Sequence, residues 1–165
     1  LTENNSVEQF IYASHHIIGG ASPEACSKVT EFYQMFSMCV SNQFFTMTPQ
    51  EASFVKYAIN SYLGMKVTFF NQLHDAALDF SCSPQRIIDA VGADNRIGYS
   101  HTRVPGFDGK KGFGGACLPK DMNAFVKFNQ DLTLIAESVK INNKMREEYE
   151  LDEREKNNNI KFEDK

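Results

Sequence analysis

A capped segment without internal proline, from Pro49 to about Phe80, constrains the fold of this chain more than any other feature. Thr48 and Glu51 form a Ser/Thr-x-x-Glu capping box, and Pro49 stands at the first helical position, where its fixed φ favours a helix start. No further proline follows for about thirty residues. The sequence therefore predicts one long helix over residues 49–80.

Apolar residues occupy most sides of this predicted helix, so it should be buried or lie between packed elements. They are Ala52, Val55, Ala58, Ile59, Tyr62, Leu63, Val67, Phe70, Leu73 and Ala77. One stripe is polar, because four side chains fall within roughly 60° of one another at about 100° per residue. These are Lys56, Asn60, Asn71 and His74. The stripe is either a solvated face or a row of buried groups that need partners.

A strand, a helix and a second strand are predicted before the long helix. Residues 16–20 have the pattern of a short buried strand that ends in glycines, and Ser22 with Pro23 opens a helix to about Met35. The β-prone residues 44–47 fall in a second strand within residues 40–47. This order suggests the end of a parallel α/β unit.

Shorter helices are predicted after the long one, over residues 84–91, 119–129 and 132–146. A loop that contains glycine and proline separates the first two, over residues 95–111. The charged, Asn-rich end of the chain is expected to be partly disordered. The predicted fold class is mainly α, a long central helix with packed helices preceded by a short strand-helix-strand remnant. The chain is expected to divide into three segments, residues 1–47, 48–146 and 147–165.

Composition and charge exclude several classes of protein. The chain has 165 residues, 42% hydrophobic and 23% charged, which is ordinary for a globular domain. A net charge of -4 without a basic stripe argues against a nucleic-acid partner. No apolar run is long enough to span a bilayer, and the first residues lack a signal-peptide pattern. We therefore expect a cytoplasmic protein with no membrane partner.

Four cysteines are spread along the chain without a Cys-x-x-Cys pair, and no His-x-x-x-His pair accompanies them. Neither a disulfide framework nor a metal site is indicated. For Cys26, Cys39 and Cys82 we expect the role of a small buried hydrophobic residue.

Cys117 has a different neighbourhood. Glycines at 112, 114 and 115 let the backbone approach a ligand closely, and Pro119 is expected to open a helix two residues after the cysteine. The positive end of that helix, with Lys120 nearby, favours a thiolate over a thiol. On local physics alone, an incidental cysteine in a glycine-rich turn remains an alternative.

The run over residues 112–121, GFGGACLPKD, closely resembles the cysteine signature of the UDP-glucose/GDP-mannose dehydrogenase family. Residues 51–71 resemble the central helix of that family, and residues 94–98 resemble a segment whose arginine reaches the neighbouring subunit's substrate. Residues 1–3 resemble the end of a substrate-cradling Pro-Glu-Phe-Leu-x-Glu motif. The resemblance covers about residues 1–145. It implies that residues 1–47 end an NAD-binding Rossmann-like domain and residues 48–146 form a central helical dimerisation domain.

The resemblance also implies a reaction, the four-electron oxidation of the C6 alcohol of a UDP-sugar to a carboxylate by two NAD molecules. UDP-glucose is the favoured substrate and GDP-mannose the alternative. Cys117 would be the nucleophile, passing through a thiohemiacetal and a thioester. Lys56 and Asn60 would donate hydrogen bonds to the C6 oxyanion, and Asp121 would act with water as a base.

Binding residues follow from the same resemblance. The implied substrate-binding residues are Glu3, Lys56, Asn60, Arg96, Phe113 and Gly114. The implied NAD-binding residues are Glu3, Cys117 and Lys120. The loop between Arg96 and Gly112 is longer than in many family members, which leaves the contacts of Tyr99 and His101 unassigned.

The 165 residues contain no Gly-x-Gly-x-x-Gly fingerprint for the NAD pyrophosphate, and we expect the tail to leave no room for a further substrate-covering domain. The NAD site is therefore expected to be incomplete in this chain. A second hypothesis is a non-catalytic dimerisation module, because the long apolar helix would expose a hydrophobic face on a monomer. Under both hypotheses we expect a homodimer formed through that helix. A thiol-redox regulator is disfavoured, because no resolving cysteine stands near Cys117.

Overall fold

The structure is a computed structural model that describes residues 6–39 and 43–163. The chain divides into two compact units, Leu1–Lys56 and Tyr57–Lys165. Helix α3 (Pro49–Asp79) begins in the first unit and continues into the second. Within the part of the chain that the structure describes, no helix is long and apolar enough to cross a membrane.

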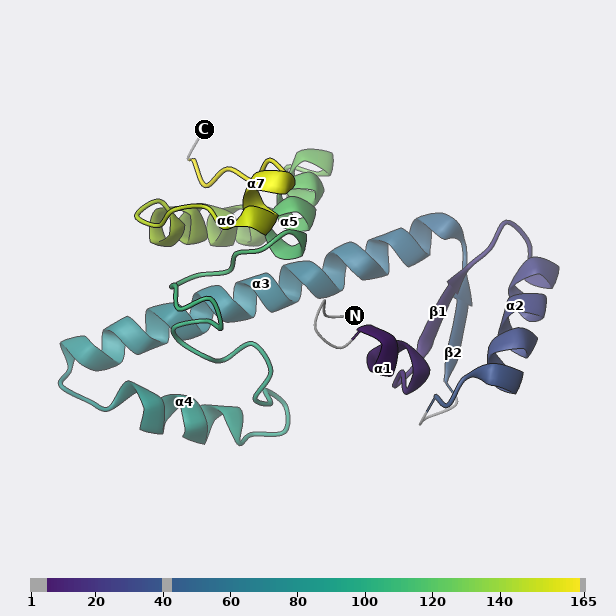
Figure 1. Ribbon diagram of the computed structural model, residues 1–165, viewed down its shortest axis with the longest axis horizontal. Helices are drawn as coiled ribbons and strands as arrows, with labels where there is room; N and C mark the ends of the chain where they lie inside the picture. Colours follow the sequence, from purple (N-terminus) through teal and green to yellow (C-terminus); the bar gives the residue numbers. More distant parts are fainter. Residues whose placement is uncertain (1–5, 40–42, 164–165) are drawn as a thin grey trace. The chain divides into compact units, whose positions relative to one another are not determined.

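The first unit is a small parallel α/β arrangement. Its elements are α1 (Ser6–Ile11), β1 (His16–Gly19), α2 (Pro23–Phe36), β2 (Phe44–Met47) and the start of α3. The two strands pair in parallel, with His16 opposite Phe44 and Gly19 opposite Met47. Helix α2 packs on both strands (Figure 1). The predicted strand-helix-strand unit is confirmed.

Local capping signals explain where the helices of this unit begin. The Ser22 hydroxyl accepts a hydrogen bond from the Ala25 amide at 3.2 Å at the start of α2. Thr48 and Glu51 form the predicted capping box of α3, since the Glu51 carboxylate accepts from the Thr48 amide at 2.8 Å and the Thr48 hydroxyl accepts from the Glu51 amide at 3.2 Å. Cys26 is buried against the strands, as expected of a small hydrophobic residue.

The second unit is helical. It contains most of α3, then α4 (Pro84–Gly92), α5 (Cys117–Phe128), α6 (Thr133–Arg146) and α7 (Glu153–Asn157). Helices α5 and α6 pack side by side (Figure 1). One apolar cluster joins them, formed by Phe113, Met122, Phe125, Ile135 and Val139. A second cluster holds α4 and the following loop against α3 through Phe70, Ile88 and Val104. Cys82, expected to be buried, is exposed.

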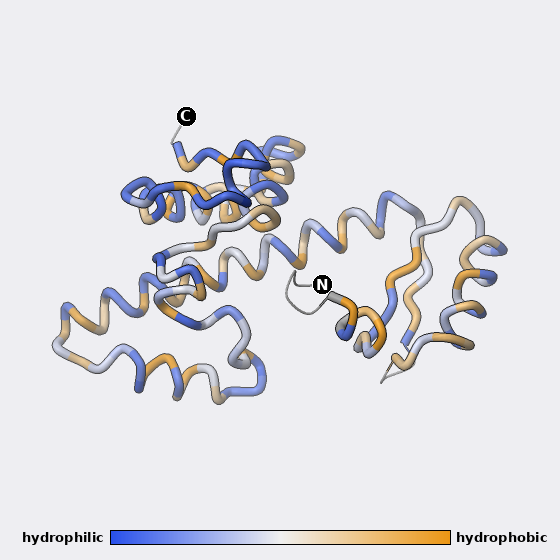
Figure 2. Tube along the Cα trace, viewed as in Figure 1, coloured by the Kyte–Doolittle hydropathy of each residue, from blue (hydrophilic) through white to orange (hydrophobic). Residues whose placement is uncertain are grey.

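The end of the chain is ordered over residues 147–163, so the expectation of partial disorder is wrong there. Figure 2 shows this segment as mainly hydrophilic with short apolar stretches. Two of its apolar side chains, Ile160 and Phe162, are nevertheless buried, and Glu155 is 0% exposed. Asp152 and Glu155 form a capping box that starts α7. A few well-placed contacts are sufficient to fix a segment that is polar on average.

Candidate active site

Cys117 is the first residue of α5 and is exposed. The helix begins two residues earlier than predicted, so Pro119 stands at its third position and not at its first. Proline is tolerated there because the amides of the first turn have no partner within the helix. No N-cap side chain binds these amides, since Ala116 occupies the cap position. The thiol therefore lies at the positive end of a helix, where negative charge is stabilised.

The loop before Cys117 needs its glycines. Gly112 and Gly115 have φ values of 75° and 74°, in the left-handed region that favours glycine. At Gly114 the restriction is steric, because a Cβ atom would overlap the Arg146 guanidinium and the Glu155 carboxylate. The glycine-rich sequence thus allows buried charged side chains to approach the loop backbone directly.

Two buried asparagines bind the backbone of this loop. The Asn71 side-chain oxygen accepts from the Gly112 amide at 3.1 Å, and the Asn142 side-chain oxygen accepts from the Phe113 amide at 2.6 Å. Asn142 also donates to the Phe113 carbonyl at 3.0 Å. Both amide side chains are buried, so these hydrogen bonds form away from water, where unpaired groups would be costly. The path of the loop is therefore fixed at successive residues.

Asn60 and Asp121 meet beside this loop. The Asn60 amide donates to the Asp121 carboxylate at 2.6 Å, and Asp121 is 2% exposed. Helix α5 approaches α3 closely at Gly64, where a Cβ atom would overlap the Sδ atom of Met122. Because Met122 follows Asp121 in sequence, this close approach brings the carboxylate to Asn60. Asn60 and Asp121, which were predicted for the site in separate roles, are thus in contact although they stand 61 residues apart in the sequence.

The polar stripe of α3 has two outcomes. Asn60 and Asn71 fit the interpretation that the stripe contains groups with hydrogen-bond partners. Asn60 binds Asp121, and Asn71 binds the Gly112 amide. His74 is half-buried and its Nδ1 atom lies 3.0 Å from the Asp75 carboxylate. Lys56 is exposed, one turn before Asn60, and is the last residue of the first unit. Its role in the site stays a prediction.

Lys120, a predicted NAD-binding residue, is exposed on the first turn of α5. Its ammonium lies 3.9 Å from the Asp121 carboxylate. Of the two predicted substrate-binding residues in the loop, Phe113 has its ring in the core, and Gly114 is half-buried beside Arg146 and Glu155. The Phe113 amide and carbonyl are both bound to Asn142, so its contact with a substrate stays a prediction. Glu3 lies outside the described residues.

Arg96 pairs with Asp94 on its own turn. Its guanidinium donates to the two carboxylate oxygens at 3.0 and 2.6 Å, and these hydrogen bonds, with one from the Arg96 amide, lower the pKa of Asp94. The same pairing raises the pKa of Arg96. The Arg96 side chain is 88% exposed. The two hydrogen bonds to Asp94 thus orient an exposed guanidinium. Its contact with a substrate stays a prediction.

Lys66 was missed by the sequence analysis. It is buried, and its ammonium donates to the carbonyls of Ile97 and Gly98 at 2.7 and 3.0 Å. Burial lowers its pKa, and burial together with the Lys66 charge lowers the pKa of His101. Lys66 thereby holds the turn after Arg96 against α3. The sequence signal that could have identified it is a lysine within a mainly apolar helix, which indicates a buried charge that needs partners.

Three further residues at the cysteine loop were also missed, Asn142, Arg146 and Glu155. Asn142 and Arg146 continue the buried stripe of Ile135 and Val139 on α6, at i+7 and i+11 from Ile135. Polar residues on such a stripe indicate buried hydrogen bonds. Glu155 could be found only as a capping-box residue, because its buried contacts are with residues distant in sequence. Among residues 6–39 and 43–163, no cluster of His, Cys, Asp or Glu could hold a metal ion.

Comparison with known proteins gives relatives that are similar in sequence to most of this chain. The UDP-glucose 6-dehydrogenase of Rhizobium meliloti (strain 1021) is 32% identical over 148 residues, covering 86% of this chain and 32% of the relative. TuaD of Bacillus subtilis (strain 168), also a UDP-glucose 6-dehydrogenase, is 27% identical over 150 residues, covering 88% of this chain and 31% of the relative. The chain thus spans about a third of the length of these curated relatives.

The structure of a UDP-glucose dehydrogenase from the hyperthermophilic archaeon Pyrobaculum islandicum is similar, with a TM-score of 0.73 and 31% sequence identity. That likeness covers 86% of this chain and 32% of the archaeal chain. The central domain of the UDP-glucose/GDP-mannose dehydrogenase family matches residues 50–145. This match includes the long helix, Asn60, Asp121 and the whole glycine-cysteine run. The chain therefore belongs to the UDP-glucose/GDP-mannose dehydrogenase family.

Proposed function

We propose that the protein to which this chain belongs is a UDP-glucose 6-dehydrogenase and that the chain carries its catalytic cysteine. The observation that supports this most is the exposed Cys117 at the start of α5, one turn before the buried Asp121 that the half-buried Asn60 binds. The named relatives and the archaeal structure favour UDP-glucose over GDP-mannose as the substrate.

Cys117 would form the covalent intermediates. Its thiolate adds to the C6 aldehyde carbon and gives a thiohemiacetal, and oxidation at the same carbon gives a thioester. Water then attacks the thioester, releasing the carboxylate and returning the thiol. A thiol suits this sequence because it is both a good nucleophile and a good leaving group. The exposed position of Cys117 gives a substrate access to the sulfur.

Three residues would stabilise charge and transfer protons at the C6 carbon, namely Asn60, Lys56 and Asp121. The amide of Asn60 and the ammonium of Lys56 can stabilise an oxyanion on C6 by hydrogen bonding. Asp121 is buried and held at 2.6 Å by Asn60, so its carboxylate has a fixed orientation. It would accept a proton, directly or through water, during addition and hydrolysis.

NAD would supply the hydride acceptor for each of the two oxidations at C6. The first turn of α5 leaves room for contact with such a cofactor, because the Lys120 ammonium and the Cys117 thiol are both exposed there. We propose that these two residues, with Glu3, contact NAD. The pyrophosphate would be bound outside this chain, which has no glycine fingerprint for it.

The test is the stoichiometry of the reaction with the full-length protein. With UDP-glucose and NAD, two NADH should appear for each UDP-glucuronate, because two oxidations occur per turnover. GDP-mannose should react at least tenfold more slowly in kcat/KM. Faster reaction with GDP-mannose would assign the protein to the other branch of its family. Absence of oxidation with both substrates would leave only the dimerisation-module hypothesis.

A further inference from the structure

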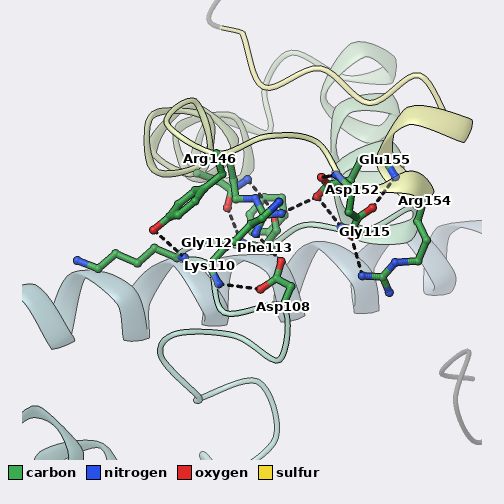
Figure 3. A network of polar contacts seen from close by, with 12 residues as sticks. Asp108, Lys110, Gly112, Phe113, Gly115, Arg146, Asp152, Arg154 and Glu155 are labelled. Carbon is green, nitrogen blue, oxygen red and sulfur yellow. Dashed lines mark hydrogen bonds and ion pairs between the residues drawn. The ribbon is translucent and has the colours of Figure 1, made fainter.

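A buried ion pair lies against the cysteine loop. The guanidinium of Arg146, at the end of α6, donates to the Glu155 carboxylate of α7 at 2.6 Å. The Arg146 and Glu155 side chains are 1% and 0% exposed. A second branch of the guanidinium donates to Asp108 at 2.7 Å, and the Asp108 side chain is 21% exposed. Figure 3 shows these charged groups gathered over the loop that leads to Cys117.

Both carboxylate oxygens of Glu155 accept hydrogen bonds. Oε1 accepts from Arg146 and also from the Gly115 amide at 3.0 Å, and Oε2 accepts from the Asp152 amide at 2.9 Å. Gly115 is two residues before Cys117. One carboxylate therefore ties the helix that starts at Asp152 to the backbone beside the nucleophile.

The segment 146–155 contacts the loop along its length. Lys110 donates to the Glu150 carbonyl, and the Lys111 amide donates to the Tyr149 hydroxyl at 3.4 Å. With the Asp108 and Gly115 contacts, loop residues from 108 to 115 are held from one side by this segment (Figure 3). Asn71 and Asn142 bind the backbone of Gly112 and Phe113 within the same loop.

Stability alone does not account for such a pair. Desolvating two charges costs several kcal/mol, and well-packed apolar residues of similar volume are often as stabilising. What apolar residues could not do is accept the Gly115 amide hydrogen bond, because that contact needs an acceptor held in one place. The pair is therefore suited to fixing backbone position, and Gly114 leaves the space it needs.

We propose that Arg146 and Glu155 are positioning residues for Cys117, holding the Gly112–Gly115 backbone so that the sulfur keeps one place relative to Asn60 and Asp121. This inference rests on the proposed function for its catalytic consequence. It goes beyond the matched family domain, since both residues lie after residue 145. The residues act through the loop and not on the substrate.

The experiment compares E155Q with E153Q in the full-length protein. Glu153 is an exposed residue of the same short helix, which makes it the matched control. Amide hydrogen exchange is measured on peptides covering residues 112–118 and 61–71, and kcat is measured with UDP-glucose and NAD. We expect E155Q to speed exchange in residues 112–118 at least tenfold and leave residues 61–71 within twofold. Since a displacement of about 1 Å can cost about 100-fold in rate, kcat should fall at least tenfold.

E153Q should match the wild type within twofold in all three readouts. If residues 112–118 of E155Q exchange like those of the control, or if kcat is unchanged, the proposal is wrong. If E155Q does not fold, D108N tests the proposal instead. Asp108 is partly exposed, and removing its negative charge weakens the contact of only one branch of Arg146. D108N should raise local exchange and lower kcat at least threefold, and a wild-type result would overturn the proposal. A wild type that does not oxidise UDP-glucose would contradict the proposed function, while the exchange result would still test the loop contact.

Discussion

At the scale of single residues, two buried charges of the second unit are hydrogen-bonded to uncharged groups. Asp121 is buried and receives a hydrogen bond from the Asn60 amide, while Lys66 is buried and donates to two backbone carbonyls. A buried charge must be hydrogen-bonded to be tolerated. Each of these hydrogen bonds also fixes a neighbouring element, α5 in the first case and the turn after Arg96 in the second.

Asp75 gives the clearest pH dependence in the second unit. Burial raises the pKa of its carboxyl, but hydrogen bonds and charge from Lys111 and His74 outweigh that effect, and the pKa is lowered. The interaction therefore stabilises the fold above the ordinary Asp pKa of about 3.9 and is lost as pH falls through the lowered value. D75N should be less stable than the wild type by about 0.2–1 kcal/mol at pH 7, because the pair is partly exposed.

Urea denaturation of the wild type and D75N between pH 2 and pH 7 measures this contribution. The difference between the two proteins should shrink as the pH falls below about 4. D79N is a suitable control, since Asp79 is exposed at the end of the same helix. A difference that stays constant over the whole pH range would show that Asp75 does not contribute through its charge.

At the scale of elements, the crossing of α3 and α5 at Gly64 decides whether Asn60 reaches Asp121. We predict that G64A destabilises the fold by about 1–3 kcal/mol, because the added Cβ overlaps the fully buried Met122. D79A, at the exposed end of α3, should stay within about 0.5 kcal/mol of the wild type. Thermal or urea unfolding measures both changes.

The cause can be separated by a double-mutant cycle. M122A removes the side chain that the new methyl group would meet, so the cost of G64A should be at least halved in the M122A background. An equal cost in both backgrounds would mean that the close approach at Gly64 is not what determines the helix crossing.

Elements with local signals were predictable from sequence. The caps at Ser22 and Thr48 with Glu51 marked α2 and α3, and both helices begin where predicted. Helix α5 was placed two residues late because Ala116 supplies no capping side chain and Pro119 is a common first residue. For the candidate site, the family resemblance predicted Cys117, Asn60 and Asp121, and the structure brings the last two into contact. The glycine-loop partners Asn142, Arg146 and Glu155 were missed, because their hydrogen bonds join residues 9 to 40 positions apart.

At the scale of the whole molecule, α3 leaves apolar side chains uncovered in the described chain. Figure 2 shows hydrophobic and hydrophilic residues alternating along this helix. Ile59, Tyr62 and Phe69 are 43%, 58% and 55% exposed and share one side of the helix. Tyr62 and Phe69 also line an apolar groove of about 420 Å³. We propose that a second copy of the protein covers this side, as the resemblance implied.

The dimer predicts a difference between two charge substitutions. Y62D should shift the full-length protein from dimer to monomer in sedimentation equilibrium, because it places a carboxylate in the proposed interface. L78D tests exposure alone, since Leu78 is exposed on the opposite side of α3. It should leave the dimer intact. A wild type that sediments as a monomer, or a Y62D variant that remains dimeric, would contradict the proposed interface.

The central claim is that Cys117 performs covalent chemistry on a nucleotide sugar. The most direct measurement compares UDP-glucuronate formation by the full-length wild type, C117S and C82S, with Cys82 as a second exposed thiol. C117S should form no measurable UDP-glucuronate and C82S should match the wild type, because we propose that the thioester forms on the sulfur at the start of α5. Carboxylate formation by C117S at the wild-type rate would contradict the account.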